Sequence, residues 1–398
     1  MIGLGVVLFT IAGIAVLACS AYLFVLAVVA ALPAASAREA VSRLRFDIVV
    51  PAHDEEAGIA VTIASLRALD YPRDRFRILV IADNCTDATA CVAAEAGALV
   101  IERRDAARRG KGYALALAFA QVERDDIADA VVVIDADSLV STDLLRAFAR
   151  RLEAGEIALQ ASYGARSPTA SWRSRLMVIA LALFHGVRSL GRERLGLSAG
   201  LRGNGMGFSR EVLRRVPAQA FSVVEDVEYG IKLAEAGYRV GYVHEAQVMG
   251  DMAPPGPAAA SQRLRWERGR AALARAEGPK LLLEGLLRRD PIRIDLAMDL
   301  LVPPLSGLVL AALLGALGST IWCAVHGGAV AVAVPWLLAC FFLAVYVLRG
   351  IALSGVGLAG SLALLWAPVY IVWKIGLRLR PGKASSGEWI RTARGGRP

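Results

Sequence analysis

Hydrophobic positions along the chain follow two kinds of pattern. Long uncharged runs occupy residues 2–32 and much of 296–373, whereas short β-branched runs alternate with amphipathic stretches between about 46 and 290. About 20 consecutive apolar residues are enough to cross a bilayer, while strand-length runs alternating with helices are typical of an α/β sheet. The pattern therefore predicts a domain of strands and helices flanked by membrane helices.

The first apolar run predicts an N-terminal transmembrane helix over residues 1–33. Its end, "ALPAASA", is similar to a signal-peptide cleavage region, but no Lys or Arg precedes the run. The run is also longer than the ~7–15 apolar residues of such a peptide. Arg38, Arg43 and Arg45 follow the run. By the positive-inside rule they place the next segment in the cytoplasm. Together with the apolar runs near the C-terminus, this leads us to expect a multi-pass protein of the cell (inner) membrane.

The C-terminal part of the chain predicts a transmembrane region over 294–376 and a basic tail over 377–398. About three apolar segments lie in it, at residues 296–325, 330–348 and 351–373. Three crossings from a cytoplasmic domain would leave the tail outside, yet its Lys and Arg residues favour the inside. A break at Pro303-Pro304 would not change this parity, whereas a re-entrant run would. We favour a cytoplasmic tail.

The middle of the chain predicts a mostly parallel sheet with helices on both faces. The expected strands are residues 46–51, 76–82, 98–102 and 130–135, and the expected helices are 57–69, 87–96, 112–123 and 141–153. Right-handed crossovers bring the carboxyl ends of such strands to one edge of the sheet, where open α/β sheets bind ligands. The loops that follow the strands are therefore expected to form the functional site.

Those loops contain carboxylates and one glycine-flanked lysine. Pro51, Asp83, Glu102 and Asp135 end the four strands, and Lys111 lies in "RGKG". Neither GxGxxG nor GxxxxGK[ST] follows a strand, so a dinucleotide site or a P-loop is not indicated. Lys111 is either a charge placed near phosphate or a solvated surface lysine.

The run "VVVIDADS" places Asp135 and Asp137 one residue apart at the end of a strand. Two hard oxygen ligands at that position could hold a divalent cation that is shared with a diphosphate. The alternative is that one Asp caps the following helix and the other is solvated.

Composition and charge narrow the class of protein. The 398 residues are 56% hydrophobic and 20% charged, with a net charge of +9. The basic residues gather beside apolar segments without interleaved aromatic residues, so a lipid bilayer is the expected partner and nucleic acid is not. The five cysteines form no CxxC and the four histidines are scattered, so no disulfide framework or His/Cys metal site is predicted.

Residues 171–195 form an arginine-rich segment with a nine-residue apolar centre at 176–184. This centre is too short to span a bilayer. We interpret the segment as an interfacial helix that seats the domain on the cytoplasmic leaflet, with a buried core helix as the alternative.

Seven motifs occur in a characteristic order over residues 46–270: PAHDEE, ADNCTD, GKGYAL, DADS, GNGMGF, VED and QRLRW. In this the chain resembles the membrane-bound family-2 glycosyltransferases of GT-A fold, the group that contains cellulose, chitin-oligosaccharide and hyaluronan synthases. The resemblance implies a GT-A glycosyltransferase domain over 46–290. It also implies an inverting, metal-dependent hexosyltransferase that moves a sugar from a UDP-sugar to a saccharide acceptor in polysaccharide or oligosaccharide synthesis.

The resemblance also implies roles on the donor side of the site. Pro51 and Glu55 would border the base and ribose of the nucleotide, and Asp83 would contact uracil. Lys111 would contact the diphosphate, and Asp135 the sugar nucleotide.

On the reaction side, the resemblance implies that Asp137 binds Mg²⁺ or Mn²⁺ and that Asp226 is the catalytic base. Gln262, Arg265 and Trp266 match the QxxRW motif, in which Trp forms an acceptor platform and Arg faces the diphosphate. Spacings of three and four residues place them on one helical face. The alternative is an amphipathic basic helix on the membrane.

The chemistry of sugar transfer agrees with these residue types. Charge on the leaving diphosphate is stabilised by a metal and by cations, and the acceptor hydroxyl must lose a proton to a carboxylate. The alternative for Asp226 is a helix N-cap with Glu228 in the first turn. Two departures from the family pattern, Asp54 in place of Asn and Val224 in place of Thr, put the sugar specificity in doubt.

Two other functions compete with synthesis of a saccharide. One is the transfer of a single sugar to a membrane lipid, such as a polyprenyl phosphate, diacylglycerol or ceramide. The other is a transporter or scaffold with a non-catalytic domain, which the intact Asp137, Asp226 and Arg265 argue against. QRLRW favours a saccharide acceptor, but four candidate spans are few for a secretion pore.

Overall fold

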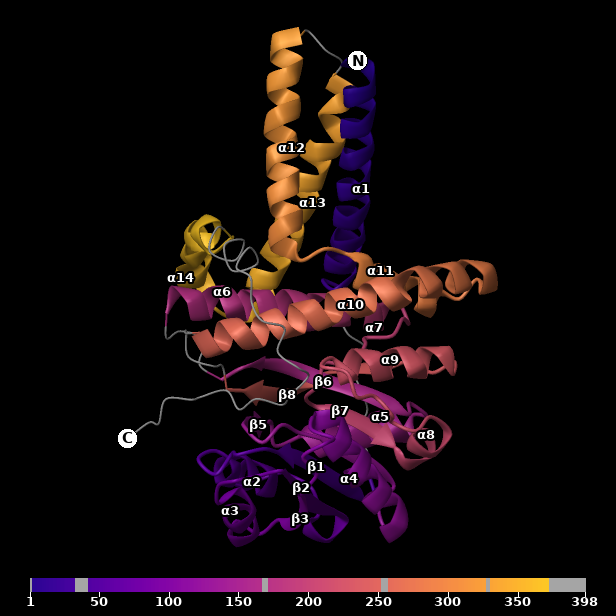
Figure 1. Ribbon diagram of the computed structural model, residues 1–398, viewed down its shortest axis with the longest axis vertical. Coiled ribbons are helices and arrows are strands. Elements are labelled where there is room, and N and C mark those ends of the chain that lie inside the picture. The colour runs from indigo at the N-terminus through magenta and orange to yellow at the C-terminus, as the bar shows by residue number, and fades with distance from the viewer. Residues whose placement is uncertain (1, 33–41, 167–170, 252–256, 327–329, 372–398) are drawn as a thin grey trace. The chain divides into compact units, whose positions relative to one another are not determined.

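The computed structural model describes residues 2–32, 42–166, 171–251, 257–326 and 330–371 (Figure 1). The predicted basic tail, 377–398, lies outside the described residues. The chain forms two compact units. One is an apolar helical unit made of Met1–Ala34, Thr169–Gly196 and Met298–Leu377. The other is an α/β unit that contains Ala35–Pro168 and Leu197–Ala297.

The α/β unit is built on one eight-stranded sheet in the order β3-β2-β1-β4-β7-β6-β8-β5. Its strands are β1 (Phe46–Ala52), β2 (Phe76–Asp83), β3 (Leu99–Arg103), β4 (Ala130–Val133), β5 (Ser138–Val140), β6 (Ala158–Ala165), β7 (Met206–Ser209) and β8 (Gly241–Gly250). The first four strands are parallel to one another, as predicted. β7 runs antiparallel between β4 and β6, β8 runs parallel to β6, and β5 antiparallel to β8.

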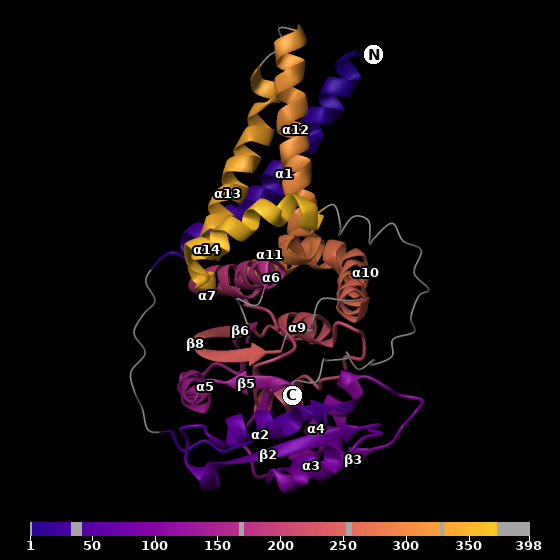
Figure 2. The same ribbon diagram turned by 90° about the vertical axis from the view of Figure 1, so that its left-hand side faces the viewer.

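Helices cover both faces of this sheet (Figure 2), as predicted. On one face lie α2 (Ile59–Arg67), α3 (Thr89–Glu95) and α5 (Leu144–Glu153), and on the other α4 (Lys111–Asp125), α8 (Arg210–Arg215) and α9 (Glu225–Glu235). Successive strand residues point to opposite faces, so Ile48 packs in the first core and Val49 in the second. β1 is buried along its whole length, which explains its mostly apolar sequence, and its one charged residue, Asp47, pairs with Arg77.

The remaining elements are helical. The α/β unit contains the turn η1 (Arg73–Arg75) and the long helix α10 (Pro257–Arg288), which is followed by α11 (Pro291–Leu301). The helical unit contains α1 (Ile2–Val29), α6 (Trp172–Leu181), η2 (Ala182–Val187), α7 (Arg188–Arg194), α12 (Leu305–His326), η3 (Val330–Val332), α13 (Val334–Ser354), α14 (Gly357–Ser361) and η4 (Leu362–Trp366).

Helices α1, α12 and α13 lie side by side in the helical unit (Figures 1 and 2). The indole ring of Trp336 on α13 fits against glycines of both partners. A Cβ atom added to Gly315 would lie 2.0 Å from this ring, and one added to Gly13 would lie 2.9 Å from it. The rings of Phe24 and Phe342 stack with centroids 4.4 Å apart. Small residues thus allow three apolar helices to approach closely, as is common within membranes.

Four helices of the described residues are long and apolar enough to cross a membrane: Val6–Val29, Trp172–Arg194, Leu305–Val325 and Val330–Ser354. The first predicted C-terminal run is interrupted at Pro303-Pro304, because α11 ends at Leu301 and α12 begins at Leu305. Within the described residues, the third predicted C-terminal run contains the end of α13, the helix α14 and the short apolar helix Leu362–Ile371.

By length and composition the 23-residue helix Trp172–Arg194 is a candidate span, contrary to our expectation that the apolar centre of this segment is too short. The sheet nevertheless excludes a single crossing. β4 precedes this helix, β7 follows it, and the two strands are hydrogen-bonded to each other from Ala130 to Val133. A crossing between them would place paired strands on opposite sides of the membrane. The helix therefore enters and leaves on one side, and its interfacial location stays a prediction.

Two arginines of this segment are buried in an ion cluster of the helical unit. Oδ1 of Asp299 lies 2.9 Å from Nη1 of Arg188 and 2.9 Å from Nη2 of Arg192. The Tyr346 hydroxyl accepts from Arg188 Nε at 3.1 Å, and the Tyr22 hydroxyl from Arg192 Nη2 at 2.6 Å. Burying these charges is costly unless they are paired and hydrogen-bonded, so the cluster fastens α7 to α1, α11 and α13.

Candidate active site

The predicted edge of the sheet brings Lys111 and Asp135 into direct contact. The ammonium nitrogen of Lys111 lies 2.5 Å from Oδ1 of Asp135, 2.5 Å from the carbonyl oxygen of Gly203 and 3.9 Å from Oε1 of Glu225. Lys111 is the first residue of α4, and its side chain is 17% exposed. The alternative of a solvated surface lysine is therefore wrong.

Gly112 allows α4 to begin at this place. A Cβ atom added to Gly112 would lie 2.1 Å from the carbonyl oxygen of Ala220, so only glycine fits against that backbone. The second glycine of "GKG" thus has a packing role, and the lysine between the two glycines is held at the strand ends.

Asp226 lies over the same loop as Lys111. A Cβ atom built on Gly203 would lie 3.5 Å from Oδ2 of Asp226 and 3.8 Å from Nζ of Lys111, so both side chains face this glycine. Helix α9 begins at Glu225 and its N-cap is Val224. The alternative of Asp226 as the N-cap is therefore wrong, because the residue lies within the first helical turn.

An apolar pocket adjoins the two acidic residues at the start of α9. It is lined by Gly112, Leu115, Phe119, Met206, Phe208, Ala218, Ala220 and Tyr229 together with Glu225 and Asp226. Burial raises the pKa of Glu225 to about 8, although Lys111 opposes this shift. Burial also raises the pKa of Asp226. The pair therefore holds protons more tightly than solvent-exposed carboxylates do, which suits a proton acceptor.

The same carboxylates determine the charge state of Lys111. Burial alone would lower the pKa of this ammonium, but Asp135 and Glu225 raise it to about 12. Lys111 is therefore a cation at neutral pH, surrounded by three carboxyl groups.

Asp135 and Asp137 occupy the loop between β4 and β5 and flank the buried Ala136. Oδ1 of Asp137 accepts a hydrogen bond from the Ser138 hydroxyl at 3.0 Å. The N-cap of the following helix is Asp143, so neither aspartate caps it and that alternative is wrong. Two partly buried carboxylates without a thiol or imidazole form a donor set that fits Mg²⁺ or Mn²⁺.

On the nucleotide side, Asp83 is 1% exposed at the end of β2. Its Oδ1 lies 2.6 Å from Nη1 of Arg103, at the end of β3. The Arg103 guanidinium lies 5.5 Å from the ring centroid of Tyr113, which stacks on Phe221. Sequence reasoning missed Arg103. The "ERR" at the strand end was the available signal, but the exposed Arg104 beside it could not be told apart from it.

Pro51 and Glu55 lie near this nucleotide side. Pro51 is buried in β1 opposite Ile81 of β2. Glu55 follows in the next loop, where its backbone N–H donates to the Thr89 hydroxyl at 2.8 Å.

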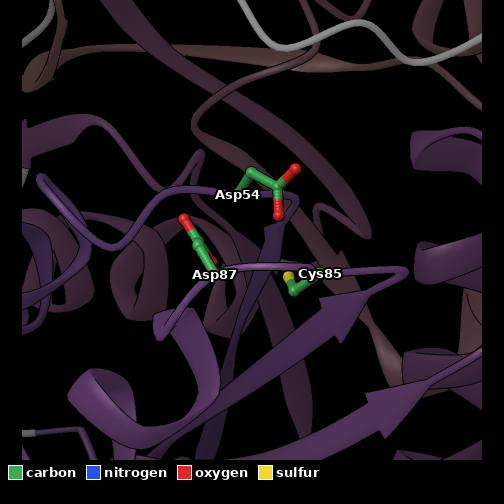
Figure 3. Close-up of side chains that lie close together, drawn as sticks. All are labelled: Asp54, Cys85 and Asp87. Atoms are coloured by element: carbon green, nitrogen blue, oxygen red, sulfur yellow. The ribbon is translucent and has the colours of Figure 1, made fainter.

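Figure 3 shows a second group of possible ligands, Asp54, Cys85 and Asp87, whose ligand atoms lie within 4.8 Å of one another. Oδ1 of Asp54 accepts a hydrogen bond from the backbone N–H of Thr86 at 2.7 Å, and Oδ2 of Asp87 accepts one from the backbone N–H of Glu56 at 3.2 Å. These carboxylates tie two loops together. Their spacing in the sequence did not indicate the group, because it joins two separate loops.

The QxxRW residues belong to α10. Trp266 is 53% exposed and Arg265 is partly buried. A Cβ atom added to Gly269, one turn further on, would lie 3.4 Å from Val224, so α10 runs beside the segment that leads to Asp226. Gln262 lies on the same helix, but its side chain is outside the described residues.

Comparison with known proteins identifies the class. Residues 44–269, more than half of the chain, match the model of "Glycosyltransferase like family 2", so the chain belongs to this family. The predicted GT-A-type α/β fold is thereby confirmed. The narrower likeness to cellulose, chitin-oligosaccharide and hyaluronan synthases stays a prediction.

Individual relatives are more distant. The chain is 25% identical over 236 residues to the probable glycosyltransferase YdaM of Bacillus subtilis, covering 56% of this chain and 55% of that protein. It is 29% identical over 229 residues to beta-monoglucosyldiacylglycerol synthase of Synechocystis sp., covering 56% of this chain and 47% of that one. The chain thus spans about half the length of these curated relatives.

A solved structure with a similar fold is the mannosyltransferase PcManGT of Pyrobaculum calidifontis, in complex with GDP-Man and Mn²⁺. Its TM-score is 0.55 at 18% identity, and the match covers 86% of this chain and 98% of that one. At this identity the likeness shows the fold alone.

Proposed function

We propose that this glycosyltransferase moves a sugar from a UDP-sugar to an acceptor hydroxyl with inversion at the anomeric carbon. The observation that carries the proposal is the convergence of Lys111 and Asp226 on Gly203, with Asp135 bonded to the same lysine. A cation for the diphosphate and a base for the acceptor therefore face the same glycine, one from α4 and the other from α9.

The donor would bind along the strand ends. Asp83, which is paired with Arg103, would accept a hydrogen bond from the N–H of uracil. Asp137, beside Asp135, would hold Mg²⁺ or Mn²⁺, which when bound offsets the charge that grows on the leaving diphosphate. Lys111 and Arg265 would add positive charge from this chain.

Asp226 would accept the proton of the attacking hydroxyl. Its burial beside an apolar pocket strengthens it as a base relative to an exposed aspartate. One base and a single in-line displacement invert the configuration, so an α-linked donor would give a β-linked product.

The first candidate acceptor is a saccharide, because the exposed ring of Trp266 can stack on a sugar. A membrane lipid is the second. Two observations favour it: the likeness to a synthase of a glucosyl lipid, and the close packing of α1, α12 and α13 around Trp336, which suits transfer at the membrane better than export through the chain.

We also propose that the chain crosses the membrane three times, through α1, α12 and α13. The helix Trp172–Arg194 cannot separate paired strands, and the last apolar helix, Leu362–Ile371, is short. Three crossings place the catalytic unit and the C-terminus on the same, cytoplasmic side, which removes the conflict in the sequence-based topology.

The function can be tested with purified full-length protein in detergent. A panel of UDP-sugars and GDP-sugars with Mn²⁺ would be offered with either oligosaccharides or diacylglycerol, while nucleotide release and products are measured. Asp137→Ala should abolish turnover, and so should EDTA. Full activity in either case would contradict the metal assignment, and release without any transferred product would contradict the transferase assignment.

A further inference from the structure

The loop of residues 202–205 leads into β7. It is hydrogen-bonded to the loop that carries Asp135 and Asp137. Gly203 and Gly205 have φ values of 80° and 70°, which non-glycine residues rarely adopt. A Cβ atom on Gly205 would also lie 2.9 Å from Val248. Both positions therefore require glycine.

Gln160 of β6, which is completely buried, holds this loop from below. Its Nε2 donates to the carbonyl oxygens of Asn204 at 2.7 Å and Ala161 at 3.0 Å, and its Oε1 accepts from the backbone N–H of Arg202 at 2.8 Å. One side-chain amide thus satisfies buried backbone groups on both sides of Gly203.

Asn204 connects this loop to the segment of Asp135 and Asp137 by hydrogen bonds. Its Oδ1 accepts from the backbone N–H of Asp135 at 3.1 Å, and its Nδ2 donates to the Ser138 hydroxyl at 2.8 Å. That hydroxyl in turn donates to Oδ1 of Asp137 at 3.0 Å. Asn204 and Ser138 are 1% and 0% exposed, so water does not compete for these bonds.

The direction of each bond follows from the chemistry of the groups. The N–H of Asp135 can only donate, which fixes Oδ1 of Asn204 toward it and Nδ2 toward Ser138. Because the hydroxyl of Ser138 accepts from Nδ2, its single proton is directed to Asp137. An amide flip would break the bond to Asp135.

We propose that Asn204 and Ser138, supported by Gln160, are positioning residues that orient the Asp137 carboxylate for a divalent cation. The inference rests on the proposed role of Asp137 as the metal ligand. Groups that hydrogen-bond to ligating carboxylates commonly change metal affinity by about 10- to 100-fold when they are removed. In the same loop, the carbonyl oxygen of Gly203 accepts a hydrogen bond from the Lys111 ammonium. The loop therefore contacts both the proposed metal ligands and the lysine proposed to bind the diphosphate.

Ser138→Ala tests the proposal, and Ser198→Ala is its matched control. Ser198 is also a buried serine, 1% exposed, and its hydroxyl accepts from the backbone N–H of Val240 at 3.1 Å. The measurement is the dissociation constant of Mn²⁺ in the presence of UDP, from the electron paramagnetic resonance signal of free Mn²⁺, on full-length protein in detergent. Ser138→Ala should weaken binding by about 10-fold or more, and Ser198→Ala should leave it unchanged.

Two further variants give each outcome a meaning. Asn204→Ala should weaken Mn²⁺ binding in the same direction, and it replaces Ser138→Ala as the test if the latter does not fold. The variant that combines Ser138→Ala and Asn204→Ala should have about the same dissociation constant for Mn²⁺ as the weaker-binding of the two single variants. The effects should not add, because both residues act through one hydrogen-bond chain.

If Ser138→Ala and Asn204→Ala bind Mn²⁺ like the wild type while Asp137→Ala does not, the positioning role is wrong and the metal ligand stands. If Asp137→Ala also binds like the wild type, or the wild type does not bind Mn²⁺, both assignments are wrong.

Discussion

The Lys111 ammonium and the Asp135 carboxylate lie 2.5 Å apart, in a site where Glu225 and Asp226 supply two further acidic groups. Lys111 is therefore the cation that allows several carboxyl groups to be buried together. Because its pKa is raised to about 12, this pairing is present throughout the neutral range and is lost only as the pH rises through that value.

Lys111→Met should consequently destabilise the protein by roughly 3–5 kcal/mol, since it leaves buried carboxylates uncompensated. It should also weaken binding of a UDP-sugar. Thermal unfolding and donor binding at pH 7 check both effects, with Lys111→Arg as the variant that keeps the charge. A Lys111→Met protein of normal stability would mean that the acidic groups are protonated or solvated without the lysine.

The raised pKa of Glu225 should make the stability of the protein depend on pH. Burial raises its pKa from 4.5 to about 8, so the folded state binds this proton more tightly than the unfolded state. The resulting stabilisation is complete below pH 4.5 and is lost as the pH rises to 8. Relative to Glu225→Gln, the wild type should lose stability over this interval, on the order of a few kcal/mol.

The measurement is the difference in unfolding midpoint between wild type and Glu225→Gln across the interval. A constant difference from pH 5 to pH 9 would contradict the raised pKa. An increase with pH would mean that the charged form of Glu225 is the stabilised one.

Substitution of Asp299 should lower the stability of the helical unit. Asp299→Asn would leave the buried Arg188 and Arg192 without their shared carboxylate, at a cost of about 3–5 kcal/mol. Glu284→Gln is the control, because Glu284 also pairs with a buried arginine, Arg293, yet is itself 49% exposed. Its loss should have little effect. Similar unfolding midpoints for both variants would contradict the importance of the cluster.

Patterns that depend on neighbouring residues allowed correct predictions. The strands β1 to β4 follow from their apolar β-branched runs, and their parallel pairing follows from the helices that alternate with them. The order of β7, β6, β8 and β5 depends on long-range antiparallel pairing that no local pattern encodes. That half of the sheet, with the three-residue strand β5 directly after Asp137, was therefore not predicted.

Long-range contacts also account for what was missed at the site. Asp226 has the sequence position of a cap, but α9 begins one residue earlier, at Glu225. Buried polar residues such as Gln160 carry no local signal of their function, because their partners lie about 40 residues away. The buried charge of Arg188 was likewise hidden, since it depends on Asp299 from another helix.

The proposed topology predicts the side of two chain positions. A reporter inserted after His326, between α12 and α13, should lie outside the cytoplasm, and one fused after Pro398 should lie in the cytoplasm. Alkaline phosphatase is active only outside and a fluorescent protein folds well inside, so paired fusions check this. Two fusions on the same side would contradict a three-crossing chain, and an external C-terminus would indicate that Leu362–Ile371 contributes to a further crossing.

Asp226→Asn separates catalysis from structure. Because Val224 is the N-cap of α9, the substitution removes no helix cap, and the amide keeps the shape of the side chain. Stability should therefore change little, and the donor should still bind, since its proposed diphosphate contacts are Lys111 and Arg265. Transfer should fall on the order of 10²–10⁴-fold, because the proton acceptor is gone.

Thermal unfolding, UDP-sugar binding and transfer rate measured on this one variant give the result, with Glu225→Gln alongside it. A stable, donor-binding Asp226→Asn protein that transfers at the normal rate would show that another group takes the proton. Glu225, which adjoins the same pocket and lies 3.9 Å from Lys111, would then be the base, and the loss of transfer should appear in Glu225→Gln instead.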